Sequence, residues 1–137
     1  MKSFFLDTNV IIDFLADRKP FAEAAAHLFS LALEKKLKMY CSAISFNNIY
    51  YLMRQTHTHP ITVALLDQIF EMTEIISVGE KIINMSLKSN FRDFEDAIQY
   101  YCALTIMQLD CIITRNTKDF KKSRLPVLSP SEALALI

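Results

Sequence analysis

The stretch KSFFLDTNVIIDFLAD, residues 2–17, places an acidic residue between two apolar segments. The run SFFL is typical of a buried strand, and the residues from Thr8 to about Ala16 have the apolar spacing of a short helix. Asp7 lies at the junction. It either caps the helix or belongs to a functional site at the end of the strand. The choice between these interpretations depends on how the rest of the chain is organised.

The remaining sequence alternates short apolar runs with helical patterns. Further strands are predicted at 39–42, 75–78, 110–114 and 125–129, and helices at 20–38, 44–55, 60–74, from about 80 onward, 93–109 and 132–137. Ser77 and Ser129 each begin a sequence typical of a helix capping box. This alternation predicts one α/β domain over residues 1–137, with a mostly parallel sheet covered by helices on both faces. Sites in such sheets form beyond the carboxyl ends of the strands, where Asp7 is expected, which favours a functional role.

The composition excludes several classes of protein. With 137 residues, 52% of them apolar and 22% charged, the chain is predicted to be globular, without a membrane span and cytoplasmic. Its single glycine, Gly79, excludes the glycine-rich loops that bind dinucleotides or nucleoside triphosphates. Cys41, Cys102 and Cys111 all lie in apolar contexts without a C-x-x-C pair. They are expected to be buried thiols rather than disulfides or zinc ligands.

Charge is balanced overall but concentrated locally. Fifteen basic and fifteen acidic residues give a formal net charge of zero, which argues against binding nucleic acid through bulk positive charge. The segment 114–124, TRNTKDFKKSR, nevertheless carries five basic residues and one acid. It fits a solvated basic turn and a rim that contacts phosphates about equally well. The three histidines form no metal-binding pattern.

Other polar residues fall at the predicted ends of elements. Asp93 and Asp96 share the first turn of the late helix, where the helix dipole favours acids and where Asp93 is a plausible N-cap. Asp96 is less ordinary because apolar residues at helical spacing press its helix into the core. Thr114 and Asn116 follow the fourth predicted strand, in a position that also suits a simple turn. Asparagine is slightly unfavourable inside a helix, so a polar partner is expected for one of the pair Asn47–Asn48.

Four ordered segments resemble the PIN-domain family, most of whose bacterial members look like toxin ribonucleases of VapBC-type toxin–antitoxin pairs. The segments are FFLDTNVIIDFL, CSAISFNNIYYL, DFEDAIQYYCAL and DCIITRNTKDF. The first and last are quite specific together, and the resemblance covers nearly the whole chain. It implies a three-layer fold with a five-stranded parallel sheet between helices. It also implies a cluster of acids that holds Mg²⁺ or Mn²⁺ and hydrolyses phosphodiester bonds in RNA.

The resemblance assigns roles to particular residues. Asp7 and Asp96 correspond to metal-binding catalytic acids, with Asp93 as a further candidate metal ligand. Asn116 corresponds to the last polar catalytic position, and Asn48 stands where the family has a glutamate, so the site loses a charge.

Further residues are expected around the acids. Glu95 or Asp119 is a candidate to supply the charge that Asn48 does not. Asn9 matches a residue that ties the loops together. Thr114 is expected to brace the site and is grouped with the residues expected to bind substrate: Thr114, Arg115, Lys118, Lys121 and Lys122.

Two main hypotheses follow. The first is a Mg²⁺- or Mn²⁺-dependent endoribonuclease, with RNA as substrate, an antitoxin protein as partner and a homodimer as its assembly. The second is a binding module on the same fold that has lost catalysis through Asn48. A small-molecule phosphohydrolase with an aspartyl nucleophile is less favoured, because Asp7 is followed by Thr-Asn and not by a second acid two residues later.

Overall fold

The computed structural model describes residues 1–137 and contains one sheet surrounded by helices. The strands are β1 Lys2–Leu6, β2 Leu37–Ser42, β3 Glu74–Ile76, β4 Cys111–Ile113 and β5 Val127–Leu128. The helices are α1 Thr8–Leu15, α2 Ala22–Leu33, α3 Ala43–Met53, α4 His59–Met72, α5 Glu80–Leu87, α6 Phe94–Leu104 and α7 Pro130–Leu134, with a 3₁₀ turn, η1, at Thr117–Phe120.

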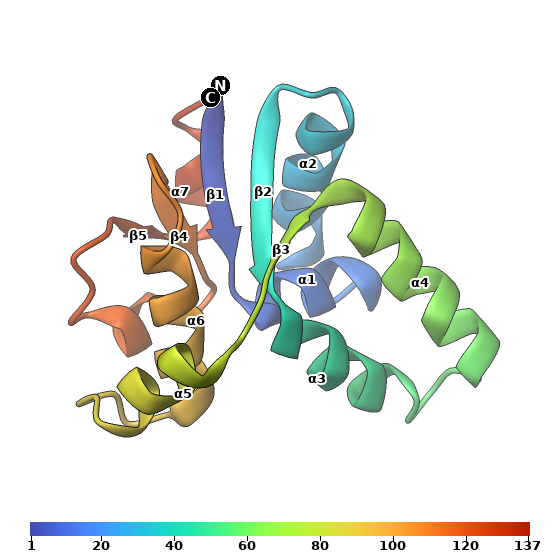
Figure 1. The fold of residues 1–137 in the computed structure, drawn as a ribbon. Helices are drawn as coiled ribbons and strands as arrows, with labels where there is room; N and C mark the ends of the chain where they lie inside the picture. Colours follow the sequence, from blue (N-terminus) through green and yellow to red (C-terminus); the bar gives the residue numbers. More distant parts are fainter.

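The five strands form one sheet in the order β3-β2-β1-β4-β5, and every neighbouring pair is parallel. β1 is therefore central, with its tip and that of β2 pointing to the same end of the molecule in Figure 1. The chain winds outward from β1 through β2 to β3, and then continues on the other side of β1 as β4 and β5. The carboxyl ends of β1 and β4 thus form the point where the winding reverses, the usual position of a site in an open parallel sheet.

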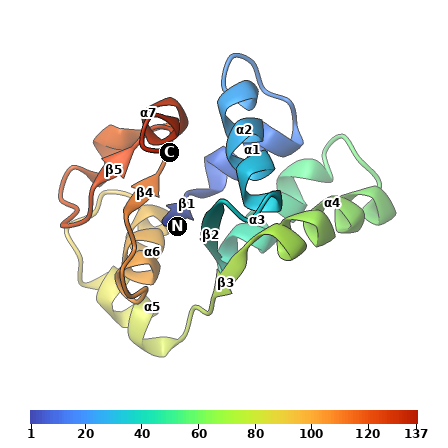
Figure 2. The same cartoon turned by 90° about the horizontal axis from the view of Figure 1, so that it is seen from above.

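Alternating residues of β1 face two separate apolar cores. Phe4 and Leu6 pack in one core with residues of α1, α2, α3, α4 and α7. Phe5 points the other way and packs with residues of α5, α6 and η1. Figure 2, seen from above, shows these helices on the two sides of the sheet. The predicted three-layer α/β fold is confirmed, and the sheet is parallel throughout.

The second helix is shorter than the sequence pattern predicted. It was expected over 20–38 with lysines at its end, but α2 ends at Leu33 and Lys35 takes a left-handed conformation with φ of 59°. The chain then enters β2, where Leu37 pairs with Lys2 of β1 and is only 3% exposed. Burial of this strand against β1 outweighs the helical propensity of the lysine-rich segment.

Two other helix boundaries differ from prediction. Ser77 does not form the predicted capping box, because α5 begins three residues later with Gly79 as its N-cap and no side-chain cap. The helix predicted over 93–109 ends at Leu104, where the Thr105 hydroxyl donates to the carbonyl of Cys102 at 2.7 Å. The capping box at Ser129 is confirmed, with its hydroxyl accepting from the Glu132 amide.

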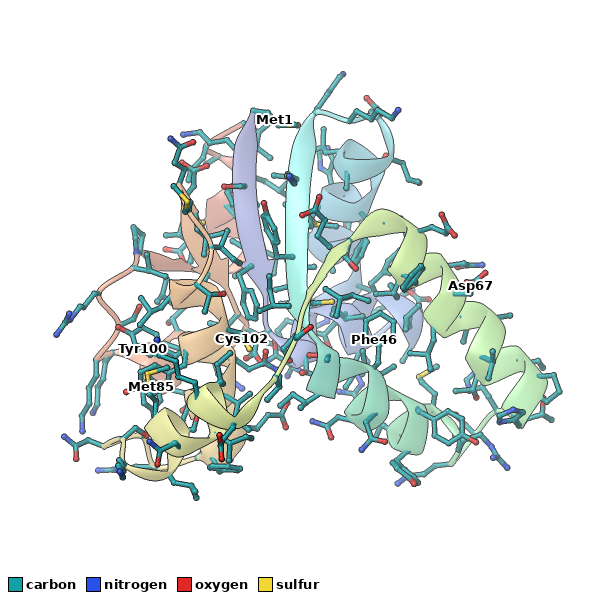
Figure 3. All side chains as sticks on the ribbon, in the orientation of Figure 1. Met1, Phe46, Asp67, Met85, Tyr100 and Cys102 are labelled. Carbon is teal, nitrogen blue, oxygen red and sulfur yellow. The ribbon has the colours of Figure 1, made fainter.

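The three cysteines are buried free thiols, as the sequence predicted. Burial raises the pKa of Cys41 to about 11 and that of Cys102 to about 12, so neither is a reactive thiolate near neutral pH. Figure 3 shows Cys102 inside the fold and Asp67 on the outer side of α4. None of the helices combines the length and apolar character needed to cross a bilayer.

Candidate active site

Asp7 lies at the point where the winding of the sheet reverses. It directly follows β1, and its backbone N–H donates to the carbonyl of Ile113, the last residue of β4, at 2.9 Å. Its side chain is only 6% exposed. One carboxylate oxygen accepts from the N–H of Thr8 and the other from the hydroxyl of Thr114, both at 2.8 Å. Asp7 therefore caps α1, which confirms the first interpretation, and it does so at the end of the central strand, so the role in a functional site stays a prediction.

No cation compensates the charge of Asp7. Burial raises its pKa to about 6, against the lowering effect of the hydrogen bonds from Thr114 and Thr8. The negative charges of Glu95 and Asp119 raise it further. Every partner of Asp7 is thus a neutral donor or another acid.

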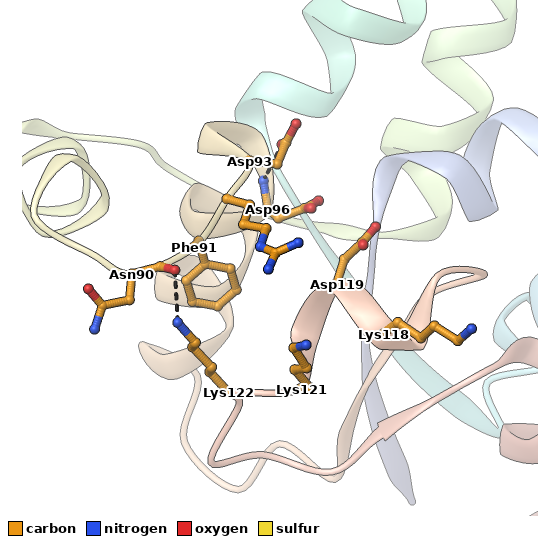
Figure 4. A pocket seen from close by; sticks show the side chains of 9 residues that line it. Asn90, Phe91, Asp93, Asp96, Lys118, Asp119, Lys121 and Lys122 are labelled. Carbon is orange, nitrogen blue, oxygen red and sulfur yellow. Dashed lines mark hydrogen bonds between the residues drawn. The ribbon is translucent and has the colours of Figure 1, made fainter.

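Asp96 lies close enough to Asp7 to feel its charge. The pKa of Asp96 is raised to about 7, first by burial, then by the charge of Asp7, and then by Asp93, Asp119 and Glu95. Asp96 is half-buried in the first turn of α6, and Figure 4 shows it beside Asp93 and Asp119 in a surface cleft. The fold therefore brings together acids from the end of β1, from the start of α6 and from η1, which are distant in sequence.

The additional acids contribute in different ways. Asp93 is the N-cap of α6, as predicted, and its carboxylate accepts from the backbone N–H of Asp96 at 3.0 Å. Glu95 and Asp119 act on both Asp7 and Asp96, whereas Asp93 acts only on Asp96. No three His, Cys, Asp or Glu side chains converge as a ready-made metal cluster. Of these acids, Asp7 and Asp96 are the two whose pKa values are raised.

The donor set fits a hard divalent cation. The converging groups are carboxylates, which are oxygen ligands of the kind that Mg²⁺ and Mn²⁺ prefer, and Mg²⁺ is commonly held by one or two carboxylates with water and substrate oxygens. Burial first, and then neighbouring acids, raise the pKa values of Asp7 and Asp96, and neither residue has a salt bridge to a basic side chain. A bound cation would remove this repulsion by favouring the ionised carboxylates. A two-metal arrangement is less well supported because too few carboxylates converge.

Thr114 and Asn9 hold the loops that surround Asp7. Thr114 is fully buried, and its hydroxyl donates to Asp7 while accepting from the backbone N–H of Asn116 at 3.1 Å. This is the bracing role, and complete burial excludes the direct substrate contact that was also expected of Thr114. Asn9 accepts from the backbone N–H of Arg115 at 3.3 Å, which is the loop contact that the resemblance implied.

Arg115 has a structural partner, Asp13, that the sequence pattern did not predict. Its guanidinium donates to both carboxylate oxygens of Asp13, at 2.9 and 3.1 Å, and lies 4.3 Å from the ring centroid of Phe21. Asp13 is 2% exposed and the Arg115 side chain 27%, so this is a bidentate ion pair with a buried carboxylate and a partly exposed guanidinium. Arg115 therefore joins the loop after β4 to α1, and because its side chain stays 27% exposed, the predicted substrate contact stays a prediction.

The two asparagines assigned to catalysis are less constrained than Asp7. Asn48 lies half-buried in α3, one turn after Ser45, whose hydroxyl contacts the hydroxyl of Thr8 at 2.7 Å. Neither Asn47 nor Asn48 hydrogen-bonds another side chain, so the polar partner expected for one of them is absent. Asn116 is exposed at the start of η1. The structure places α3 beside Asp7 through Ser45, whereas the catalytic roles of Asn48 and Asn116 stay predictions.

A cleft with a basic rim opens beside Asp96. It has a volume of about 600 Å³ and nine lining residues, of which only Phe91 is hydrophobic. Figure 4 shows Lys118, Lys121 and Lys122 on one side of it. Its full lining is Asn90, Phe91, Arg92, Asp93, Asp96, Lys118, Asp119, Lys121 and Lys122.

The lysines of this cleft differ in their contacts. Lys122 donates to the carbonyl of Asn90 at 3.0 Å, whereas Lys118 and Lys121 have no salt bridge or hydrogen bond within the chain. Arg92 was not among the predicted substrate-binding residues. Its position directly before the predicted N-cap Asp93 was the sequence signal that could have identified it.

Comparison with known proteins agrees with this geometry. A family model described as the PIN domain matches residues 3–118. The chain belongs to the PIN-domain family. This PIN chain is similar to Ribonuclease VapC1 of Aquifex aeolicus (strain VF5), at 24% identity over 134 residues that cover 93% of the chain and 90% of that relative.

Solved structures share the same fold. A toxin–antitoxin complex from Klebsiella pneumoniae matches with a TM-score of 0.64 and 27% identity, covering 92% of this PIN chain and 96% of that one. VapBC2 from Rickettsia felis, bound to a DNA fragment from its promoter, matches with a TM-score of 0.67 at 18% identity, covering 93% and 97% of the two chains. The relatives of this PIN chain thus include a ribonuclease and chains of toxin–antitoxin complexes.

Proposed function

We propose that this PIN chain is a Mg²⁺- or Mn²⁺-dependent endoribonuclease and the toxin of a toxin–antitoxin pair. The observation that carries the proposal is the uncompensated charge of buried Asp7 beside Asp96, at the carboxyl ends of the central strands. The charge of Asp7 raises the pKa of Asp96, and such repulsion between acids does not stabilise the fold. Such a pair is useful where a cation binds.

Asp7 and Asp96 would hold the metal ion, which when bound would polarise the scissile phosphate and lower the pKa of an attacking water. Thr114 and the N–H of Thr8 orient the Asp7 carboxylate through both of its oxygens. Asn48 and Asn116 are assigned to orienting water or phosphate, since their amides bring no negative charge. Asp93 is assigned mainly to capping α6, and through it to positioning Asp96.

The basic rim supports an RNA substrate. Lys118 and Lys121 lack acidic partners within the chain, so their ammonium groups are free to contact phosphates beside Asp96. Lys122 and Arg92 line the same cleft. Contacts of this kind bind the RNA backbone without reading its sequence, and they weaken as salt increases.

A mixed pool of tRNA, rRNA and mRNA tests the proposed activity. The chain should cut RNA in Mg²⁺ or Mn²⁺ and not in EDTA, and Asp7→Asn should remove the cutting while the protein stays folded by circular dichroism. The matched control is Asp67→Asn, an exposed acid on the outer side of α4. Cutting that is insensitive to EDTA or undiminished in Asp7→Asn would contradict the proposal.

Position 48 supports a second candidate, an RNA- or protein-binding module without catalysis. Asn48 supplies no charge, and no third acid converges on Asp7 and Asp96. Asn48→Glu distinguishes the two functions. Cleavage that appears only in this variant would identify the natural chain as a binding module, whereas metal-dependent cleavage by the natural chain would establish the nuclease.

We also propose that this chain binds an antitoxin protein and that it forms a homodimer. These proposals are supported by the toxin–antitoxin complexes among the similar structures and by exposed apolar side chains such as Tyr51 and Phe70, which are 66% and 57% exposed. Light scattering at micromolar concentration should give twice the mass of the 137-residue chain. A monomer would count against the dimer alone.

A further inference from the structure

Beneath Asp7 lies a cluster of three buried polar side chains from three different helices. The amide nitrogen of Gln99 donates to the hydroxyl of Thr8 at 2.8 Å and to that of Ser45 at 3.1 Å, with a longer contact of 3.5 Å to the carboxylate of Glu95. The two hydroxyls are 2.7 Å apart. Gln99 and Ser45 are fully buried and Thr8 is 5% exposed. This trio, Thr8–Ser45–Gln99, joins α1, α3 and α6.

Each member of the trio lies next to a residue assigned to the active site. Thr8 follows Asp7, and its backbone N–H donates to the Asp7 carboxylate. Ser45 precedes Asn48 by three residues in α3, and Gln99 follows Asp96 by three residues in α6. Residues three apart lie on the same side of a helix. Figure 1 shows α1 and α3 beginning directly below the tips of β1 and β2, so a small shift of either helix would displace the site residues.

The trio does not have the contacts expected of a group that stabilises the fold. The side-chain oxygen of Gln99 is buried and has no donor. A buried polar group without a partner destabilises the fold, and a partly satisfied network is less stable than apolar packing of the same shape. The surrounding core residues of α6, such as Ile98 and Cys102, are apolar. A buried amide that contacts both hydroxyls therefore calls for a role other than filling the core.

We propose that Gln99 is a positioning residue that, through Thr8 and Ser45, fixes the separation of α1, α3 and α6 and thereby sets the affinity of the site for its divalent ion. The inference rests on the metal site proposed above. Gln99 touches neither metal nor substrate. It acts because Asp7 caps α1 whereas Asp96 lies in the first turn of α6, so contacts between these helices help to hold the two carboxylates at one spacing.

Two substitutions at Thr8 separate positioning from packing. Thr8→Val keeps the shape of the side chain and removes the hydroxyl, whereas Thr8→Ser keeps the hydroxyl and removes a methyl group. Gln99→Met tests the centre of the trio with an apolar side chain of similar length. Ile98→Val, in the neighbouring position of α6, is the control for loss of packing alone. All variants are made in the full chain, and thermal unfolding without metal checks that each is folded.

The measurement is binding of Mn²⁺ alone, followed by calorimetry or by the electron paramagnetic resonance signal of the free ion. Removing groups that orient metal ligands typically weakens metal binding by about 10–100-fold. We expect a loss of at least about tenfold in Thr8→Val and Gln99→Met. Thr8→Ser should stay within about threefold of the natural chain, and Ile98→Val should bind normally even though its unfolding temperature falls.

Three results would overturn the inference. Unchanged Mn²⁺ affinity in Thr8→Val and Gln99→Met would show that the trio is only structural. Weaker binding in Thr8→Ser than in Thr8→Val would assign the effect to packing, as would losses of affinity that follow the unfolding temperature across all variants. If the natural chain binds no Mn²⁺ and cuts no RNA, the proposed function itself fails and this inference fails with it.

Discussion

Asp7 and Asp13 are two buried aspartates six residues apart, and they differ in whether a basic side chain pairs with the carboxylate. Asp13 is 2% exposed and receives two hydrogen bonds from the guanidinium of Arg115, with Arg18 at 3.9 Å. Asp7 is 6% exposed and receives one hydrogen bond from a hydroxyl and one from a backbone N–H. One acid is neutralised by the protein, and the other is not.

The difference shows how burial alone fails to identify a functional acid. A carboxylate that is already paired with arginine cannot bind a cationic ligand without breaking that pair. Asp7 has no cationic partner and lies near further acids, at the carboxyl end of a strand, where open parallel sheets usually bind ligands. The proposed function therefore predicts that the partner of a buried acid, more than its burial, distinguishes a structural acid from a functional one. The following measurements test that distinction.

The largest expected effect is on stability, at Asp13. Arg115→Met leaves a buried carboxylate without its main partner, which should lower the free energy of unfolding by about 3–5 kcal/mol at pH 7. Replacing both residues, Asp13→Leu with Arg115→Met, should recover much of the loss because no charge is then left unpaired. Urea unfolding measures both values. A loss below about 1 kcal/mol in Arg115→Met would remove the basis of the comparison.

A divalent ion should stabilise the protein through Asp7 and Asp96 and have no effect through Asp13. Mn²⁺ at 100 times its dissociation constant should add about 2.7 kcal/mol at pH 8. The gain should shrink at pH 5, because the pKa values of about 6 and about 7 leave Asp7 and Asp96 mostly protonated there. Thermal unfolding with Mn²⁺ or with EDTA measures the difference, and Asp7→Asn is the control. An equal gain at both pH values would place the ion elsewhere.

Removing the charge of Asp96 should stabilise the metal-free chain while abolishing cleavage. An acid whose pKa rises on folding contributes stability below its ordinary pKa of 3.8, and this stability is lost as the pH rises through about 7. Asp96→Asn cannot ionise, so above pH 7 it should be more stable by about 1–2 kcal/mol, a value discounted for partial solvent screening. The gain should vanish near pH 4. Urea unfolding at the two pH values checks this, and a destabilised variant at pH 8 would contradict it.

The smallest effects are expected at the lysines of the cleft. Lys118→Ala and Lys121→Ala should each leave the free energy of unfolding within about 0.5 kcal/mol, in contrast to Arg115→Met. Each should raise KM for RNA a few-fold and reduce the dependence of log KM on log salt by about 0.7. Cleavage measured over a series of salt concentrations gives this slope. An unchanged slope in both variants would place the RNA on another surface.

Much of the fold followed from local pattern. The apolar runs of β1, β2 and β4 and the capping box at Ser129 were predicted because strand burial and helix capping depend on neighbouring residues. Helix ends were less well predicted. The predicted end of α2 was too late because the strand pairing of Leu37 with Lys2, 35 residues away, decides where that helix must end.

The sequence by itself determined the α/β class, the parallel sheet and the positions of Asp7 and Asp96 at the ends of their elements. These follow from periodicity and from residues close together in the chain. Only the tertiary structure decided that Arg115 belongs to Asp13, that Thr114 is a buried brace, and that Gln99 joins Thr8 to Ser45. These contacts join residues 54 to 107 positions apart. Hydrogen bonds and ion pairs act over a few ångströms, so which groups meet is settled only when the sheet brings distant segments side by side.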